Sequence, residues 1–199
     1  MASQRPDTLE RRAYQEAGHA VMSYLIRQGF TDKFVPFDRS LILPAFERVA
    51  IEGPSVDWGK ITFGLGSLIT ASQVLLAGYA AERIKYDIRG DVLPQDLALV
   101  KRAEHLTAAY IEEYAGDSVR AMKKRDRRAT QMVRKMLNFV EKTLRTYWVS
   151  VEVLANALLQ YRSVTEAEAF EIIARDIPET AKARAEANIQ RWKRRFDRA

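Results

Sequence analysis

The sequence contains no cysteine and only two histidines, His19 and His105. The absence of cysteine excludes disulfide bonds, cysteine-ligated zinc and thiol nucleophiles. Two histidines cannot form a three-histidine metal site, so a catalytic zinc here needs a carboxylate among its ligands. No apolar run approaches the roughly 18 residues that suggest a membrane span, and residues 1–12 lack the apolar core of a signal peptide. We therefore expect a soluble chain in the cytoplasm or inside an organelle.

The rest of the composition is that of a globular protein with excess positive charge. The chain has 199 residues, of which 47% are hydrophobic and 29% charged, and its net charge is +6. The basic excess lies in two clusters, residues 120–135 and 190–198. Such clusters occur on nucleic-acid-binding surfaces, but acidic residues interleave with these: Asp126, Glu141 and Asp197. We favour solvated helix faces, and we do not expect nucleic acid as a partner.

The pattern of apolar residues predicts a mainly α fold with a small β element after the first helix. Helices are predicted over residues 8–28, 67–85, 94–114 and 117–149, followed by two short helices within 150–176 and a charged helical tail. The only predicted strands are "RVAIEG" (48–53) and "KITFG" (60–64). Thr165 and Glu168 have the spacing of a capping box at the start of the second short helix. We expect one domain over residues 1–178 and the tail over 179–199.

A candidate metal site lies in the first predicted helix, in the stretch "QEAGH" (residues 15–19). Helical spacing places Gln15 and His19 on one face, with Glu16 beside them. In the zinc-peptidase signature H-E-x-x-H, two imidazoles bind the metal and the Glu acts as the base. The stretch differs from that signature only by Gln15 in place of the first histidine.

A third protein ligand has to come from elsewhere in the chain. Asp96, in the first turn of a predicted helix, is a good candidate for a carboxylate ligand, and Asp91 in the preceding loop is a weaker one. His105 follows Asp96 by nine residues, which places it about 180° around that helix. We therefore interpret His105 as an ordinary polar histidine.

Four stretches resemble, in the same order, the peptidase domain of the FtsH family of ATP-dependent zinc metalloproteases. "AYQEAGHAVMSYLI" is similar to the family's active-site helix, A-Y-H-E-A-G-H-A, and "VLLAGYAAERI" to its L-x-G-x-A-A-E-E-I helix. "GDVLPQDLALVKRAEHL" resembles the G-x-x-N-D-L segment that carries the third zinc ligand, and "VEVLANALLQYRSVTEAEAFEII" resembles the closing helices. The resemblance spans residues 9–173. It implies an FtsH-type peptidase-like helical domain whose short strands match the family's substrate-binding edge.

The resemblance also assigns roles to individual residues. It implies that Glu16 is the catalytic base, that His19 is the second zinc histidine and that Asp96 is the third ligand. Gln15 stands where the family has its first zinc histidine. The chain has no G-x-x-x-x-G-K-[ST] phosphate loop, so we expect no use of ATP. The implied partners are a protein or peptide substrate, a second copy of the chain, or complete family members.

Gln15 decides between two functional hypotheses. Zinc prefers an imidazole nitrogen to an amide oxygen, so we expect zinc binding to be weak or absent. A hydrogen bond between Gln15 and Asp96 is one way in which such a site closes without metal. The first hypothesis is a peptidase-fold protein with a degenerate zinc site that acts by binding peptides or partners. The alternative is a functional zinc metalloendopeptidase with a variant Q-E-x-x-H site, in which Gln15 is a weak ligand.

Overall fold

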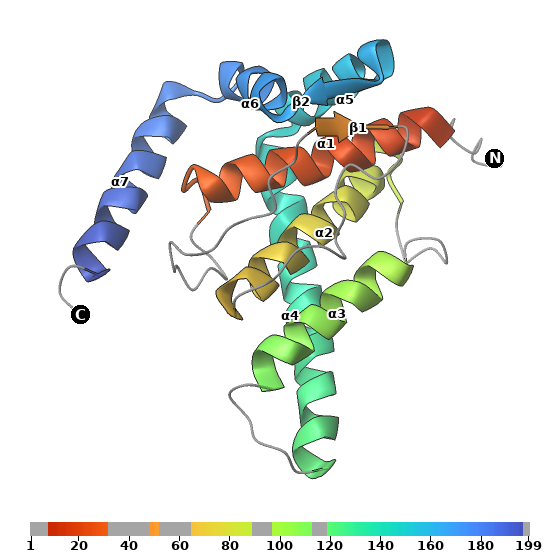
Figure 1. Ribbon diagram of the computed structural model, residues 1–199, viewed down its shortest axis with the longest axis vertical. Helices are drawn as coiled ribbons and strands as arrows, with labels where there is room; N and C mark the ends of the chain where they lie inside the picture. Colours follow the sequence, from red (N-terminus) through yellow and green to blue (C-terminus); the bar gives the residue numbers. More distant parts are fainter. Residues whose placement is uncertain (1–7, 32–47, 52–64, 89–96, 113–118, 197–199) are drawn as a thin grey trace.

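The computed structural model describes residues 8–31, 48–51, 65–88, 97–112 and 119–196. Its elements are α1 (Thr8–Arg27), β1 (Arg48–Ala50), α2 (Leu65–Lys85), α3 (Leu97–Glu112), α4 (Val119–Thr146), α5 (Trp148–Tyr161), β2 (Ser163–Thr165), α6 (Glu166–Arg175) and α7 (Glu179–Phe196). Figure 1 shows α5 and α6 on one side of α1, with α2, α3 and α4 on the other. The predicted mainly α fold is confirmed. None of the described helices combines the length and the apolar character that crossing a membrane requires.

The α1 and α2 helices cross at very short range, and a glycine permits this. A methyl group added at Gly18 of α1 would lie 2.5 Å from the carbonyl oxygen of Ala77 and 2.7 Å from Cβ of Ala81. Because three small residues meet at the crossing, the two backbones approach more closely than larger side chains allow. This contact fixes the separation of the two helices that carry the candidate site.

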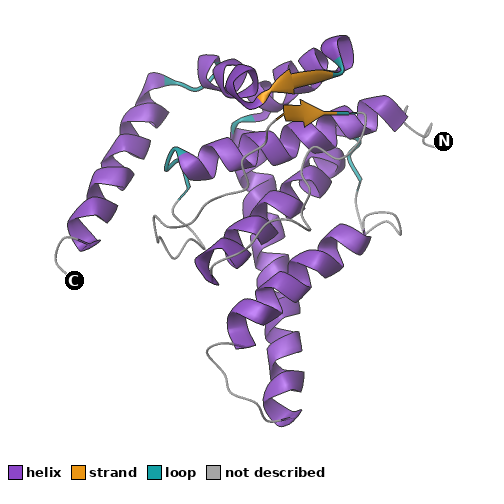
Figure 2. Ribbon diagram, in the orientation of Figure 1, coloured by secondary structure: helices purple, strands orange, loops and turns teal. Residues whose placement is uncertain are grey.

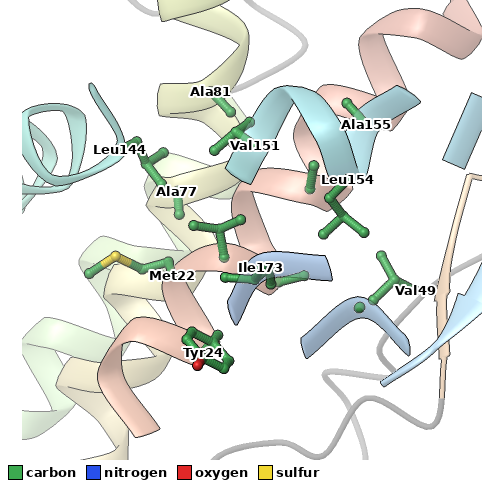
Figure 3. Close-up of a cluster of buried hydrophobic side chains, with 14 of the residues drawn as sticks. Met22, Tyr24, Val49, Ala77, Ala81, Leu144, Val151, Leu154, Ala155 and Ile173 are labelled. Atoms are coloured by element: carbon green, nitrogen blue, oxygen red, sulfur yellow. The ribbon is translucent and has the colours of Figure 1, made fainter. Parts of the chain in front are cut away.

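The main hydrophobic core surrounds α1, with residues of α2 and α4 on one side of it and residues of α5 and α6 on the other, and Figure 3 shows a cluster of its side chains. All of the residues labelled there are buried: Met22, Tyr24, Val49, Ala77, Ala81, Leu144, Val151, Leu154, Ala155 and Ile173. Complete burial of one large apolar side chain such as Leu154 stabilises the fold by about 1.5–3 kcal/mol. Val49 belongs to β1, so the strand is held against α1 by the same core.

The α4 helix has one buried stripe and one charged face. The buried residues recur at intervals of three or four: Ala129, Val133, Met136, Val140 and Leu144. They pack toward α2 and α3, and Figure 1 shows α4 continuing beyond that contact as a long arm beside α3. The exposed side chains of the same helix include four cations from the first basic cluster: Arg127, Arg128, Arg134 and Lys135. The described part of this cluster therefore lies on a solvated helix face.

The helix predicted over residues 117–149 is wrong at its C-terminal end, because α4 ends at Thr146 and α5 begins at Trp148. Tyr147, between them, has φ −111° and ψ 31°, which is outside the helical range. Its ring packs edge-on against Phe30, with ring centroids 6.0 Å apart. No glycine or proline marks the break in the sequence. Packing against a distant aromatic residue therefore accompanies a bend that local sequence signals do not show.

The two strands form one antiparallel pair, in which Val49 of β1 faces Val164 of β2 (Figure 2). The prediction that all of the sheet lies within residues 48–64 is wrong, because the partner strand comes from residues 163–165. The predicted strand at residue 48 is confirmed, whereas "KITFG" lies outside the described residues. A three-residue strand between two helices is too short to show an alternating pattern. Its pairing depends on the tertiary fold.

The predicted capping box is confirmed at the start of α6. The Thr165 side chain accepts a hydrogen bond from the backbone N–H of Glu168 at 3.3 Å. In return, the backbone N–H of Thr165 donates to Oε2 of Glu168 at 2.7 Å. Two N–H groups at the helix start are thereby satisfied, and β2 passes into α6 without an intervening loop.

The α7 helix occupies the predicted charged tail and docks on the end of α1. Nδ2 of Asn188 donates a hydrogen bond to the carbonyl oxygen of Gly29 at 3.2 Å. Gly29 has φ +75°, a left-handed conformation that glycine adopts readily at the end of a helix. A Cβ atom there would lie 2.8 Å from Cγ1 of Ile189. The tail is therefore attached to the body through the middle of α7.

Candidate functional site

Gln15 and His19 lie one turn apart on α1, and both side chains reach the same glycine of α2. A Cβ atom added to Gly78 would lie 2.5 Å from both Cε1 and Nε2 of His19 and 2.8 Å from Cγ of Gln15. Only glycine leaves room for the two side chains at this point of α2. The structure thus brings together the two residues that the i, i+4 spacing pairs.

The imidazole of His19 is buried and has a fixed orientation. His19 is only 5% exposed, and its Nδ1 lies 2.6 Å from the carbonyl oxygen of Val74. Because a carbonyl oxygen only accepts hydrogen bonds, Nδ1 carries the proton and donates it. Nε2 is the other ring nitrogen, and it lies against Gly78. Histidines that bind metals show this arrangement, in which one ring nitrogen donates to a backbone carbonyl and the other is the ligand.

Glu16 lies beside this pair and is half-buried. Within the described part of the chain it forms no ion pair. One turn earlier on α1, Nη1 of Arg12 donates a hydrogen bond to the carbonyl oxygen of Ile51 at 3.4 Å. The end of β1 therefore contacts α1 one turn before the predicted catalytic base.

The other predicted ligands are not described together with this pair. Asp96 and Asp91 both lie outside the described residues. His105 is exposed on α3, where it lines a groove of about 360 Å³ between α3 and α4 with Arg125 and Asp126. Its exposure beside charged residues suits an ordinary polar histidine.

The described donor atoms do not by themselves fit a catalytic zinc. Among the residues that the structure describes, no three His, Cys, Asp or Glu side chains gather closely enough to hold a metal ion. What α1 offers is one imidazole nitrogen from His19 and one amide from Gln15. A catalytic zinc takes three protein ligands, usually imidazoles and carboxylates, and retains a water. A zinc site in this chain would need a ligand from outside the described residues, where the predicted ligand Asp96 lies, and tolerance of the amide.

Sequence reasoning missed two residues that shape this site, Val74 and Gly78. Both belong to the stretch "VLLAGYAAERI" that resembles the family motif. An isolated glycine inside an apolar helix signals the close approach of another group, and Gly78 is such a glycine. The role of Val74 had no sequence signal, because it acts through a backbone carbonyl that every residue possesses.

Polar contacts lock the α1–α2 crossing on the N-terminal side of the site. Nζ of Lys85 donates to the hydroxyl of Tyr14 at 2.7 Å, and this hydrogen bond raises the pKa of Lys85. The ring of Tyr14 stacks on Trp148 of α5 with centroids 5.9 Å apart. Nε of Arg11 lies 2.5 Å from Oε2 of Glu82, whose side chain is only 1% exposed. The two helices are thus held in register one turn before Gln15.

A scan against models of protein families gives no match for this chain, and a search of curated proteins gives no match either. The resemblance to FtsH-type peptidases is therefore an expectation from the quoted motifs alone.

Proposed function

We propose that this chain is an FtsH-type metallopeptidase-like domain with a degenerate zinc site, and that it acts by binding peptides or a protein partner. The observation that supports this proposal is the convergence of His19 and Gln15 on Gly78. One of the two ligand positions on α1 holds an oriented imidazole, and the other holds an amide.

The His19 position has what a zinc ligand requires. The hydrogen bond from Nδ1 to the carbonyl of Val74 fixes both the tautomer and the orientation of the ring. Contacts of this kind contribute about 10–100-fold to metal affinity in zinc proteins. This oriented imidazole supports the proposal of a metallopeptidase-like site on this side.

The Gln15 position lacks the matching chemistry. A neutral amide oxygen is a poorer donor to zinc than an imidazole nitrogen. Since loss of a supporting contact alone costs about 10–100-fold, we expect loss of a directly bound imidazole to cost about 10³-fold in affinity. A chain with this defect retains the surfaces of the fold, and β1 beside α1 suits it to binding an extended segment.

Zinc titration of the metal-stripped chain, beside a Gln15→His variant, tests the proposal. We expect the variant to bind about one zinc per chain and the natural sequence to bind about 10³-fold more weakly. Gln28→His is the matched control, because it adds a histidine at an exposed position directly after α1. Tight, stoichiometric binding by the natural chain would show that the site is not degenerate.

A second candidate, a functional zinc metalloendopeptidase, is favoured by Glu16. This carboxylate is half-buried beside His19 and is not engaged in an ion pair within the described residues. Such a carboxylate is suited to accept a proton from a bound water. Zinc-dependent cleavage of unfolded casein by the natural chain, abolished in Glu16→Gln, would establish this function in place of the first. Under the first proposal neither protein cleaves casein.

A further inference from the structure

A groove of about 410 Å³ lies between β2 and α6. Its apolar lining residues are Tyr161, Val164 and Ile172, and its charged lining residues are Glu168, Glu171 and Arg175. A cavity of this size with an apolar floor and a few polar groups has the character of a binding site. None of these residues belongs to the α1–α2 site.

The α5 helix, which ends at the groove, carries exposed apolar side chains. In the described part of the chain, the exposed large hydrophobic side chains are Val149, Val153 and Tyr161, at 58%, 42% and 63% exposure. All three lie on α5, and the four-residue spacing places Val149 and Val153 on one face. Tyr161, the most exposed of them, also forms a wall of the groove. Apolar side chains concentrated on one helix in this way often mark an interaction site.

The groove is also acidic, in contrast to the rest of the protein. Its charged lining residues are two carboxylates and one guanidinium, whereas the whole chain has a net charge of +6. Hydrogen bonds from Thr165 lower the pKa of the Glu168 carboxyl, which is therefore ionised at neutral pH. Glu171 lies 3.9 Å from Arg175, and both side chains are about three-quarters exposed. Such a pair is weak, so Glu171 can exchange Arg175 for another cation.

The backbone of β2 gives the groove an edge to which an extended chain can pair. The N–H of Ile51 donates to the carbonyl oxygen of Arg162 at 3.1 Å, next to the pair of Ala50 with Ser163. Hydrogen-bonded pairs alternate along antiparallel strands, so the N–H and C=O of Ser163 point away from β1. The described sheet has two strands, so this edge of β2 is an outer one. Peptides commonly bind by adding a strand to such an edge.

We propose that the groove between β2 and α6 binds an extended peptide segment in which an arginine or lysine stands beside an apolar residue. The apolar side chain packs on Tyr161 and Ile172, and the cation pairs with Glu171 next to the ring of Tyr161. The inference rests on the proposed binding function, and it assigns that function a surface separate from Gln15 and His19. The charge of the groove selects basic segments over acidic ones.

Fluorescence anisotropy with the full chain tests this assignment. The probe is a fluorescein-labelled nonapeptide with an Arg–Leu–Arg centre between glycine–serine flanks, and the control peptide carries citrulline in place of each arginine. We expect the citrulline peptide to bind at least about 10-fold more weakly, because it has the same shape and no charge. Glu171→Lys and Tyr161→Ser should each weaken binding of the probe about 10-fold, a change of about 1.4 kcal/mol. Glu186→Lys, the same charge change at an exposed position of α7, should leave binding unchanged.

Three results would overturn the assignment: equal affinity for the two peptides, unchanged affinity in Glu171→Lys, or no binding at about 1 mM protein. If Glu171→Lys alters the sedimentation of the protein and not its affinity for the probe, the groove joins two copies and the peptide assignment is wrong. Gln15→His should bind the probe like the natural chain. Loss of binding in Gln15→His, with the groove variants unaffected, would place the peptide at the α1–α2 site, which supports the proposed function and contradicts this inference.

Discussion

Replacing Gly78 with alanine tests the central contact of the candidate site. The new Cβ would lie 2.5 Å from two atoms of the His19 ring and 2.8 Å from Cγ of Gln15, so the helices must separate or the ring must move. Overpacking of a buried contact costs about 1–3 kcal/mol. Alanine is the better helix former, which offsets about 0.8–1 kcal/mol of that cost. We therefore expect a net loss of about 0–2 kcal/mol in the free energy of unfolding.

Urea denaturation followed by circular dichroism measures this change, and a double-mutant cycle with His19→Ala assigns it to the ring. If the cost comes from the collision with His19, Gly78→Ala should be close to neutral or stabilising once the imidazole is removed. The same substitution in a Gln15→His background should weaken zinc binding, because it displaces the imidazole. A Gly78→Ala protein that is more stable than the natural one, or an equal cost with and without His19, would refute the reasoning.

Three further predictions concern polar contacts. Arg11→Met should lower the free energy of unfolding by about 2–4 kcal/mol in urea denaturation, because it removes a cation that pairs with the buried Glu82. Arg175→Met is the control, because Arg175 belongs to an exposed pair, and it should change the free energy of unfolding by less than about 0.5 kcal/mol. Thr165→Ala should cost about 1 kcal/mol by removing a helix cap. The folded protein lowers the pKa of Glu168 below its ordinary value of 4.5, so the stabilisation from this carboxylate is present above that pH and is lost as the pH falls below it. Glu168→Gln should remove this part of the pH dependence, and an unaltered slope of stability against pH below 4.5 would contradict the assignment.

The helices could be predicted because each has a long apolar pattern or a clear boundary signal. Residues 8–27 and the capping box at Thr165 are examples, since a run of apolar residues or a hydroxyl three residues before a Glu is visible in the sequence. The break at Tyr147 could not be predicted, because the packing against Phe30 that accompanies it involves a residue more than a hundred positions away. The pairing of β1 with β2 is of the same kind, since strands of three residues have no periodicity of their own.

For the candidate site, spacing alone brought Gln15 and His19 to one face, and the structure places both against α2. Spacing could not show which ring nitrogen of His19 donates a hydrogen bond, because the acceptor is the backbone carbonyl of Val74 on another helix. Nor could it show that Gly78 is the residue that makes room for the ring. Both are properties of the helix crossing, which depends on how α1 and α2 approach one another.

His19 has a structural role that does not depend on metal, and this changes what its presence indicates. The ring fills the space beside Gly78 and satisfies the carbonyl of Val74 from a buried position, so the packing of α1 against α2 requires it even without zinc. Glu16 is different, because it is half-buried and forms no ion pair within the described residues. If the chain is a peptidase, as in the second candidate function, Glu16→Gln is therefore expected to abolish cleavage with less effect on folding than His19→Ala.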